Sequence, residues 1–342
     1  MYDKSIHAMQ SRRRFIAGLS AAGAASLVLS PRSVHAEPPP ETTTVRLPWW
    51  GDGAYCWAAA FVAKELLSAE GFSDVRYVKG HSTADNAEWI ASGETDFDIN
   101  MPTMHIASID AGVPIKVLAG LHAGCFEVIA IDSIRSLTEL KGKRVGVSAL
   151  NSHPHVLTSL MVNYVGLDPV NDIQWVEGKE TAPMQLFIDG KIDAFLAAEY
   201  EPQQMRDRKI GHAIVSNAVD RPWSQYFCCM IAGTADYVNR YPVATKRILR
   251  SILKAADLCA SDPQRVAQQL ADRGFVPSRD YAIQTLNEAR YDVWREYDAE
   301  DSVRFYALRM QETGMIKSSP QEIIARGTDW SFLNELKREL KG

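Results

Sequence analysis

Apolar and polar positions follow a repeating order between residues 141 and 199. A run of alternating residues over 142–148 predicts a buried strand, and apolar residues at helical spacing over 156–165 predict a helix that ends at Gly166. A strand over 173–176, a helix over 181–190 and a strand over 193–198 follow. Strands that alternate with helices predict a mostly parallel sheet, because parallel neighbours need a crossover between them.

The same order precedes this region and predicts a second sheet of the same kind. Strands are expected at 43–48, 74–79, 96–101 and 115–121, and helices over 55–71, over 83–92 and from Pro102. Beyond Asp236 the pattern is helical, with helices expected over 237–260, after Pro263, and over 279–296, 302–313, 320–326 and 331–340. The predicted fold class is therefore α/β, with two lobes that are each doubly wound.

Two apolar, β-rich segments at 126–131 and 225–232 are interpreted as the crossings between these lobes. This interpretation assigns residues 37–131 and 225–342 to the first lobe and residues 132–224 to the second. A chain of 342 residues is long enough for two cores of ordinary domain size.

The first 36 residues have the pattern of an export signal. Paired arginines in 11–18 match the twin-arginine type, a weakly apolar run covers 17–29, and small residues precede a cleavage point near Ala36. The signal predicts the twin-arginine export machinery as a partner and the periplasm as the location. The mature protein, 37–342, is expected to be soluble and monomeric. The alternative is a basic amphipathic N-terminus without this role.

Charge excludes some classes of partner. The formal net charge is −5, and residues 1–36 hold five basic residues against one acidic residue, so the mature chain has a net charge of −9. An acidic chain of this kind is not expected to bind nucleic acid or an anionic membrane. After residue 36, no stretch approaches the roughly 20 apolar residues that a membrane span needs.

The chain has five cysteines, an odd number that leaves at least one thiol outside any internal disulfide. A bridge between the adjacent Cys228 and Cys229 would be strained, so buried free thiols are favoured there. Cys56 and Cys125 both fall near predicted strand ends, and a bridge between these two stays open.

Candidate ligand-binding residues lie where the predicted strands end, because ligands of such sheets bind outside the carboxyl ends of the strands. The aromatic group at 49–55 predicts a wall on which a planar ligand stacks, although packing against helices is the alternative. Glu199 could accept hydrogen bonds from a ligand amine or amide. The full set is Trp49, Trp50, Tyr55, Asn100, Thr103, Cys125, Ser148, Ser152, His153, Glu199 and Tyr226.

Neither a catalytic residue nor a metal or other cofactor is predicted. The histidines at 153 and 155 are separated by a single proline, a spacing that is not typical of a metal site, and a hydrogen bond to ligand from Ser152 or His153 is favoured instead. The chain lacks the phosphate-loop, dinucleotide, nucleophile-elbow and zinc-protease motifs. These absences favour a binding protein over an enzyme.

Several ordered segments carry a family resemblance. They are Val165-Gly166-Leu167-Asp168-Pro169, residues 172–176, residues 186–195 and Tyr200-Glu201-Pro202. Over roughly residues 45–260 the chain resembles the periplasmic substrate-binding proteins of the nitrate/sulfonate/taurine type, a family that includes binders of thiamine-pyrimidine precursors.

The resemblance implies a type II periplasmic binding protein fold that closes on a small molecule by hinge bending and delivers it to the permease of an ABC importer. Two alternatives stay open: a receptor for a sensor kinase, and an enzyme on the same fold that makes a pyrimidine precursor. That enzyme group uses a cysteine-rich run, of which this chain has only the pair at 228–229.

The candidate residues give only a slight preference for one class of ligand. The candidate residues include aromatic side chains and Glu199 but no arginine or lysine, which favours a neutral or nitrogenous planar ligand over a sulfonate or a nitrate-like anion. Helix N-termini can nevertheless hold an anion with their backbone N–H groups, so the anions stay open.

Overall fold

The computed structural model describes residues 37–49, 55–80, 83–179 and 181–341. By its internal contacts the chain separates after Pro38, and residues 39–342 form one compact unit. The predicted export signal, 1–36, and Trp50 lie outside the described residues. Among the described helices, none has the length and apolar character needed to cross a bilayer.

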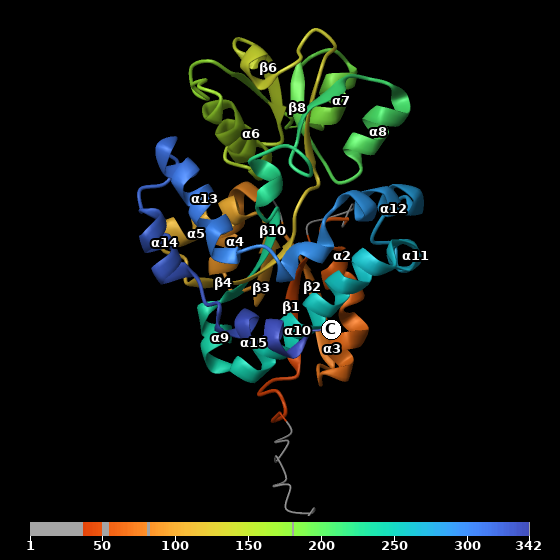
Figure 1. Cartoon of the computed structure of the whole chain (residues 1–342), viewed down its shortest axis with the longest axis vertical. Coiled ribbons are helices and arrows are strands. Elements are labelled where there is room, and N and C mark those ends of the chain that lie inside the picture. The colour runs from red at the N-terminus through yellow and green to blue at the C-terminus, as the bar shows by residue number, and fades with distance from the viewer. Residues whose placement is uncertain (1–36, 50–54, 81–82, 180, 342) are drawn as a thin grey trace, which may run out of the picture. The chain divides into compact units, whose positions relative to one another are not determined.

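The first lobe contains two small sheets that lie side by side (Figure 1). β1 (Thr44–Trp49) and β2 (Asp74–Lys79) are parallel. β10 (Cys229–Thr234) lies between β3 (Phe97–Asn100) and β4 (Ile115–His122) and is antiparallel to both. Arg46 joins β1 to the segment before β3, because its backbone N–H donates to the Asp96 carboxylate over 2.7 Å.

Helices of the first lobe come from both ends of the chain. α10 has a buried stripe that includes Ile248, Ile252 and Ala256, and it packs against α2 and β4. The helices are α2 (Ala58–Val62), α3 (Lys64–Ala69), α4 (Asn86–Ala91), α5 (Pro102–Asp110), α9 (Ala235–Arg240), α10 (Pro242–Ser261), α11 (Pro263–Asp272), α12 (Arg279–Glu288), α13 (Ala299–Glu312), α14 (Pro320–Gly327) and α15 (Ser331–Glu339). Short 3-10 turns cover Thr83–Asp85 and Tyr291–Arg295.

The second lobe is built on a five-stranded sheet in the order β7-β6-β8-β5-β9. β6 is parallel to β7 and β8, whereas β5 is antiparallel to β8 and β9. The strands are β5 (Phe126–Ala130), β6 (Arg144–Val147), β7 (Gln174–Glu177), β8 (Ala194–Ala198) and β9 (His212–Ser216). The helices are α6 (His153–Tyr164), α7 (Pro183–Ile188) and α8 (Glu201–Arg208), with 3-10 turns at Leu137–Leu140 and Trp223–Gln225.

Strand alternation divides the apolar residues of this sheet between two layers of helices. Phe195 and Ala197 pack with Phe187 of α7 and Met205 of α8. The neighbours of Phe195 along β8 belong to the other core cluster, which holds Leu157 of α6. Because successive side chains of a strand point to opposite faces, helices cover both faces, as the sequence predicts for a doubly wound sheet.

Both predicted crossings, 126–131 and 225–232, need a change, because β5 and the first residues of β10 lie in sheets. The apolar, β-rich pattern over 126–131 predicts a crossing, but the hydrogen bonds of β5 to β8 and β9 place this strand in the sheet of the second lobe. The chain crosses instead at Ala123–Cys125, between β4 and β5, where Gly124 and Cys125 both have positive φ. It returns through residues 217–228, between β9 and β10. The remaining lobe boundaries stay a prediction.

Candidate functional site

The two crossings meet at the strand ends of the first lobe. β4 ends at His122, and β10, which is antiparallel to it, begins at Cys229, its partner in register. The backbone N–H of Cys228 donates to the His122 carbonyl over 2.8 Å. Cys125 lies three residues after His122 and Cys228 one residue before Cys229, and their Sγ atoms are 3.0 Å apart. This edge of the sheet therefore carries a histidine and several thiols.

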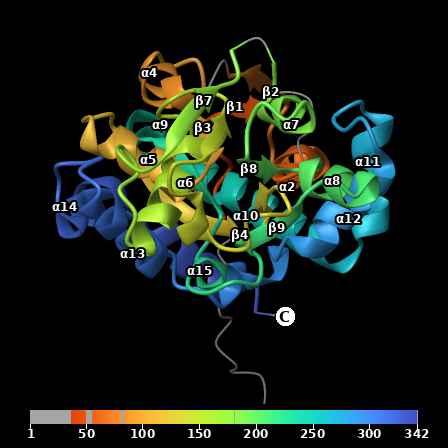
Figure 2. The ribbon, with the colours of Figure 1, turned by 90° about the horizontal axis from the view of Figure 1, so that it is seen from above.

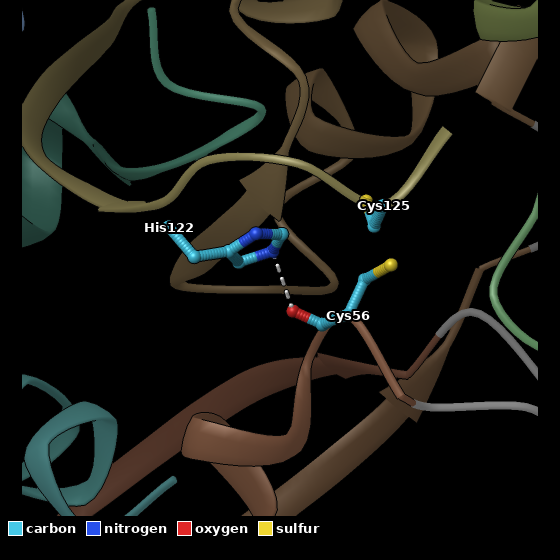
Figure 3. A group of neighbouring side chains, drawn as sticks. All are labelled: Cys56, His122 and Cys125. Atoms are coloured by element: carbon cyan, nitrogen blue, oxygen red, sulfur yellow. Dashed lines mark hydrogen bonds between the residues drawn. The ribbon is translucent and has the colours of Figure 1, made fainter. Parts of the chain in front are cut away.

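Cys56 joins this group from the segment before α2. His122 Nε2 lies 3.0 Å from the carbonyl oxygen of Cys56, and the Tyr291 hydroxyl donates to the same oxygen over 2.8 Å. The rings of His122 and Tyr291 lie 4.7 Å apart. Figure 3 shows Cys56, His122 and Cys125 facing one another, with the hydrogen bond between His122 and Cys56. All five cysteines are free thiols, so the bridge considered between Cys56 and Cys125 does not form, and Cys228 and Cys229 are buried as expected.

The thiols influence one another's pKa values. Burial raises the pKa of the Cys125 thiol, and its contacts with Cys228 and Cys229 raise it further. Burial also acts to raise the pKa of Cys228, but hydrogen bonds from Cys125 and Cys229 outweigh this effect and lower the pKa to about 7. Burial acts to lower the pKa of His122, yet the neighbouring Cys229 outweighs it and leaves this pKa raised.

Glu199 follows β8 in the second lobe and lies close to this group. Burial raises the pKa of its carboxyl well above the usual range, and Cys56, Glu201 and Cys229 add to the effect. Its backbone has φ of 57°, and its carbonyl accepts a hydrogen bond of 3.1 Å from Thr285 of α12. A carboxyl in this environment favours the neutral form, which can donate a hydrogen bond as well as accept one.

The predicted aromatic wall is only partly exposed. Tyr55 is fully buried, its hydroxyl is 3.4 Å from the Ser278 carbonyl oxygen, and its ring lies 5.5 Å from that of Tyr200. Trp49 is half-buried against the core, with the Lys79 ammonium 5.5 Å from its ring centroid. Tyr226 stacks on Phe305 of α13 at 3.9 Å between centroids. The three rings therefore contact different parts of the structure.

The other predicted residues of the first lobe are buried. The Asn100 amide donates to Asn86 over 3.2 Å and its oxygen accepts the Met101 N–H over 2.9 Å, so both of its polar groups are bonded within the protein. Thr103 is fully buried in α5, and its hydroxyl has no hydrogen-bond partner among the described residues.

In the second lobe, the serine and histidine loop is organised locally. The exposed Ser148 donates to Ser152 over 3.1 Å, and Ser152 donates to the Ala149 carbonyl over 2.6 Å, so its hydroxyl does not cap α6. His153 packs its ring 5.0 Å from Phe126, and burial lowers its pKa to about 4. The loop therefore presents a neutral histidine at neutral pH.

Two cavities adjoin the junction of the lobes. One, of about 210 Å³, is lined by Met104, Met310 and Met315 of the first lobe and by Asn151 and Val156 of the second. The other lies beside Cys125 and Glu199 and is only about 10 Å³, room for about one water molecule. Among the described residues that line these two cavities, none is an arginine or a lysine.

A third cavity, of about 620 Å³, lies at the opposite edge of the first-lobe sheet. It is lined by Arg46, Arg76, Asp96 and Arg240, near the amino ends of β1 and β3. Because ligands of open α/β sheets bind at the carboxyl ends of the strands, the junction of the lobes is the better candidate despite its smaller cavities.

Comparison with known proteins identifies the family. Residues 62–266 match the family model described as NMT1/THI5 like. The chain belongs to the NMT1/THI5-like family. No curated protein gives a significant match. This NMT1/THI5-like chain has a periplasmic binding protein fold, as its resemblance to the nitrate/sulfonate type implied.

Solved structures support that fold. The periplasmic nitrate-binding protein NrtA from Synechocystis PCC 6803 matches with a TM-score of 0.74 and 16% identity, over 89% of this chain and 90% of that one. The aliphatic sulphonate-binding protein SsuA from Escherichia coli matches with a TM-score of 0.65 and 16% identity, over 85% and 93% of the two chains. The alkanesulfonate-binding protein SsuA from Xanthomonas axonopodis pv. citri, bound to MOPS, gives 0.64 and 14%, over 83% and 96%.

Sequence reasoning missed the residue that organises the cluster. His122 ends an apolar strand, and a position at the carboxyl end of that strand, three residues before Cys125, was the signal that could have identified it. Tyr200 and Tyr291 were missed as well, because their contacts with Tyr55 and Cys56 join segments that are distant in the sequence.

Proposed function

We propose that this protein is a periplasmic solute receptor that closes its two lobes on a small molecule and delivers it to the permease of an ABC importer. The observation that carries the proposal is the convergence of the strand ends of both lobes on the two crossings. Cys125, Glu199 and Tyr55 come from three such ends. The family and the binding proteins of the same fold support a receptor over an enzyme.

Contacts between the lobes support hinge closure. α8 of the second lobe lies beside α12 of the first in both Figure 1 and Figure 2. Arg206 of α8 is 2.7 Å from Glu288, Gln203 donates to the same carboxylate over 2.9 Å, and the Tyr281 hydroxyl donates to Asp207 over 3.0 Å. The bonds of Arg206 and Tyr281 are exposed, and exposed bonds contribute at most about 1 kcal/mol each, so they can form and break as the lobes move.

The class of ligand follows from the lining of the junction. A nitrate or sulfonate needs a cation or several N–H donors to replace its hydration, and the described residues lining both junction cavities include no basic side chain. Methionine side chains and a carboxyl with a raised pKa suit a neutral or nitrogenous planar molecule better. We therefore place a pyrimidine-like ligand ahead of an oxyanion in this proposal.

The proposal extends to the export of the protein. Residues 1–36 supply a twin-arginine signal with cleavage near Ala36, and the mature chain acts as a soluble monomer in the periplasm. N-terminal sequencing of protein from the periplasmic fraction tests the cleavage point, and a lysine pair in place of Arg12 and Arg13 should stop export. A mature N-terminus far from Glu37 would contradict this part of the proposal.

A thermal-shift screen of residues 37–342 tests the binding role. The panel contains pyrimidines, aromatic acids, amines, nitrate, bicarbonate and sulfonates, and ligand recovered after denaturation is identified by mass spectrometry. Binding to the folded state raises the midpoint of unfolding by mass action, so one class should give a large shift and be returned unaltered. Conversion of the compound would indicate an enzyme, and a shift only with the anions would overturn the proposed ligand class.

A further inference from the structure

We propose that Cys56, His122 and Cys125 form a binding site for a thiophilic metal cation, Zn²⁺ or Cu⁺, at the crossings between the lobes. Each of the three residues offers one ligand atom, and these atoms all lie within 4.8 Å of one another. Distances in this range allow a single ion to contact all three after small side-chain rotations, because metal–sulfur and metal–nitrogen bonds are about 2.0–2.3 Å long. Figure 3 shows the three side chains converging from two segments of the chain.

The surroundings of His122 give independent support. Nε2 faces the carbonyl oxygen of Cys56, which can only accept, so Nε2 carries the hydrogen and the lone pair of the neutral ring lies on Nδ1. Nδ1 has no hydrogen-bond partner among the described residues, and the side chain is fully buried. A buried acceptor without a partner is unfavourable, and a metal–ligand bond at this nitrogen would offset that cost.

The hydrogen bond from His122 Nε2 to the Cys56 carbonyl is also typical of metal-binding histidines. Such a histidine donates its other N–H to a carbonyl or carboxylate, which fixes the orientation of the ring. Here the Cys56 carbonyl has that role and is itself held by the Tyr291 hydroxyl over 2.8 Å. The residue that orients the histidine is thus also the residue whose thiol would bind the ion.

The donor set determines which ion fits. Two thiols and an imidazole are soft and borderline donors, which suit Zn²⁺ and Cu⁺ and are poor ligands for Mg²⁺ or Ca²⁺. Cys228, whose Sγ is 3.0 Å from that of Cys125, is a further thiol beside the three clustered residues.

This inference does not depend on the proposed transport role, because it uses only the residues of the cluster. It is tested on the reduced, full-length chain under anaerobic conditions by equilibrium dialysis against Zn²⁺, with metal measured by mass spectrometry. We expect one Zn²⁺ per chain. The variants Cys56→Ser, His122→Gln and Cys125→Ser should each weaken binding more than about tenfold, because each removes a ligand.

Cys259→Ser is the matched control, since Cys259 is a buried thiol of α10 that is not among the three clustered residues. It should bind Zn²⁺ as the unaltered chain does. Zinc binding that survives all three cluster variants, or that Cys259→Ser abolishes, would overturn the inference, and so would a reduced chain that binds no Zn²⁺.

The visible absorption spectrum of bound Co²⁺ tests the site on the unaltered chain, so this measurement does not depend on whether the variants fold. Co²⁺ added to the unaltered chain should give the intense visible absorption of a tetrahedral site together with thiolate-to-metal charge-transfer bands. A weak spectrum of octahedral type without those bands would overturn the inference. Zinc that displaces the cobalt spectrum in proportion to the amount added would support it.

Discussion

Cys125 and Cys228 are 103 positions apart in the sequence, yet their Sγ atoms lie 3.0 Å from each other. Each belongs to one of the two segments by which the chain passes between the lobes. Thiols at this distance can be joined by a small rotation about the Cα–Cβ bonds. A disulfide between the two thiols would therefore form at the place where the two lobes are connected.

Oxidation of the metal-free protein should join these two residues. Diamide, which takes up two hydrogen atoms as two thiols become a disulfide, is expected to link Cys125 to Cys228 before any other pair, because theirs is the closest described contact between two sulfur atoms and the Cys228 pKa of about 7 supplies a thiolate. Peptide mapping under non-reducing conditions identifies the bridge. A bridge between Cys56 and Cys125 as the main product would contradict this expectation.

A methyl group at Gly120 should destabilise the first-lobe sheet. A Cβ placed there would overlap the ring of Phe227, which is fully buried next to Cys228. Overpacking of this kind costs about 1–3 kcal/mol, so Gly120→Ala should lower the free energy of unfolding measured in urea by that amount. Adding Phe227→Leu to Gly120→Ala should restore part of the loss if the clash is the cause, and a purely additive pair would argue against it.

The buried pair of Asp98 and His105 should be sensitive to the removal of one partner. Both side chains are almost fully buried, with His105 Nε2 3.0 Å from the Asp98 carboxylate, and Asn86 donates to the same oxygen over 3.2 Å. Asp98→Ala leaves both neighbours without their acceptor and should cost about 3–5 kcal/mol in chemical denaturation. Asp98→Asn keeps an acceptor and should cost less, and equal losses in the two variants would contradict the explanation.

Glu201 should make the protein less stable as the pH rises. Burial raises its pKa to about 7, although the Ala198 N–H that it accepts acts in the opposite direction. The neutral form is thus favoured by folding, so this contribution is complete below the unfolded pKa of about 4.5 and is lost as the pH rises through 7.

The size of this effect is set by the shift in pKa, because one unit is worth about 1.4 kcal/mol. The free energy of unfolding of Glu201→Gln, minus that of the unaltered chain, should be about 2–3 kcal/mol larger at about pH 8 than at about pH 5, as measured by urea unfolding. The exposed Glu88→Gln serves as the control variant. A pH-independent difference for Glu201→Gln would show that its carboxyl does not titrate in this range.

Trp49 should contribute to ligand binding if the aromatic wall is correct. Trp49→Ala removes a half-buried ring at the end of β1 and is expected to weaken binding of a planar ligand about tenfold, since a stacked ring contributes about 1–1.5 kcal/mol. Isothermal titration with the ligand found by the thermal-shift screen measures the change. Trp330→Ala, which removes a half-buried ring before α15, should leave the affinity unchanged. Equal affinities in all three proteins would reject the wall.

The sequence was sufficient for most of the strands and helices because their apolar residues have a clear period. β2 was predicted at its observed bounds, and β6 and β8 within two residues. β9, His212–Ser216, was missed because it is short and only partly buried, so alternation along it is weak. The helix expected over 55–71 is interrupted after Val62, where a run of small buried alanines packs closely and gives no signal of a break.

The site was less predictable than the fold. Position at a strand end was the reason to predict Cys125 and Glu199, since topology fixes which ends face one edge, and the two do line the same small cavity, although their binding role stays a prediction. Position at a strand end could not show that the polar groups of Asn100 form hydrogen bonds with Asn86 and Met101, or that Tyr55 is fully buried. Both features depend on tertiary packing. Cys56 and His122 are 66 positions apart and are joined through a backbone carbonyl, so the pattern of side chains along the sequence could not predict their contact.

The close approach of the two crossings restricts how the lobes can move. A Cβ at Gly124 would lie 3.0 Å from the Cβ of Ala218, so the outgoing and returning segments touch here as well as at Cys125 and Cys228. A line drawn through these contacts between the two segments crosses the junction of the lobes. Rotation of one lobe about that line leaves both segments unstretched, whereas translation or a second rotation would separate them. If the lobes close by hinge bending as proposed, a cross-link or a shared ion at this position would act directly on the hinge.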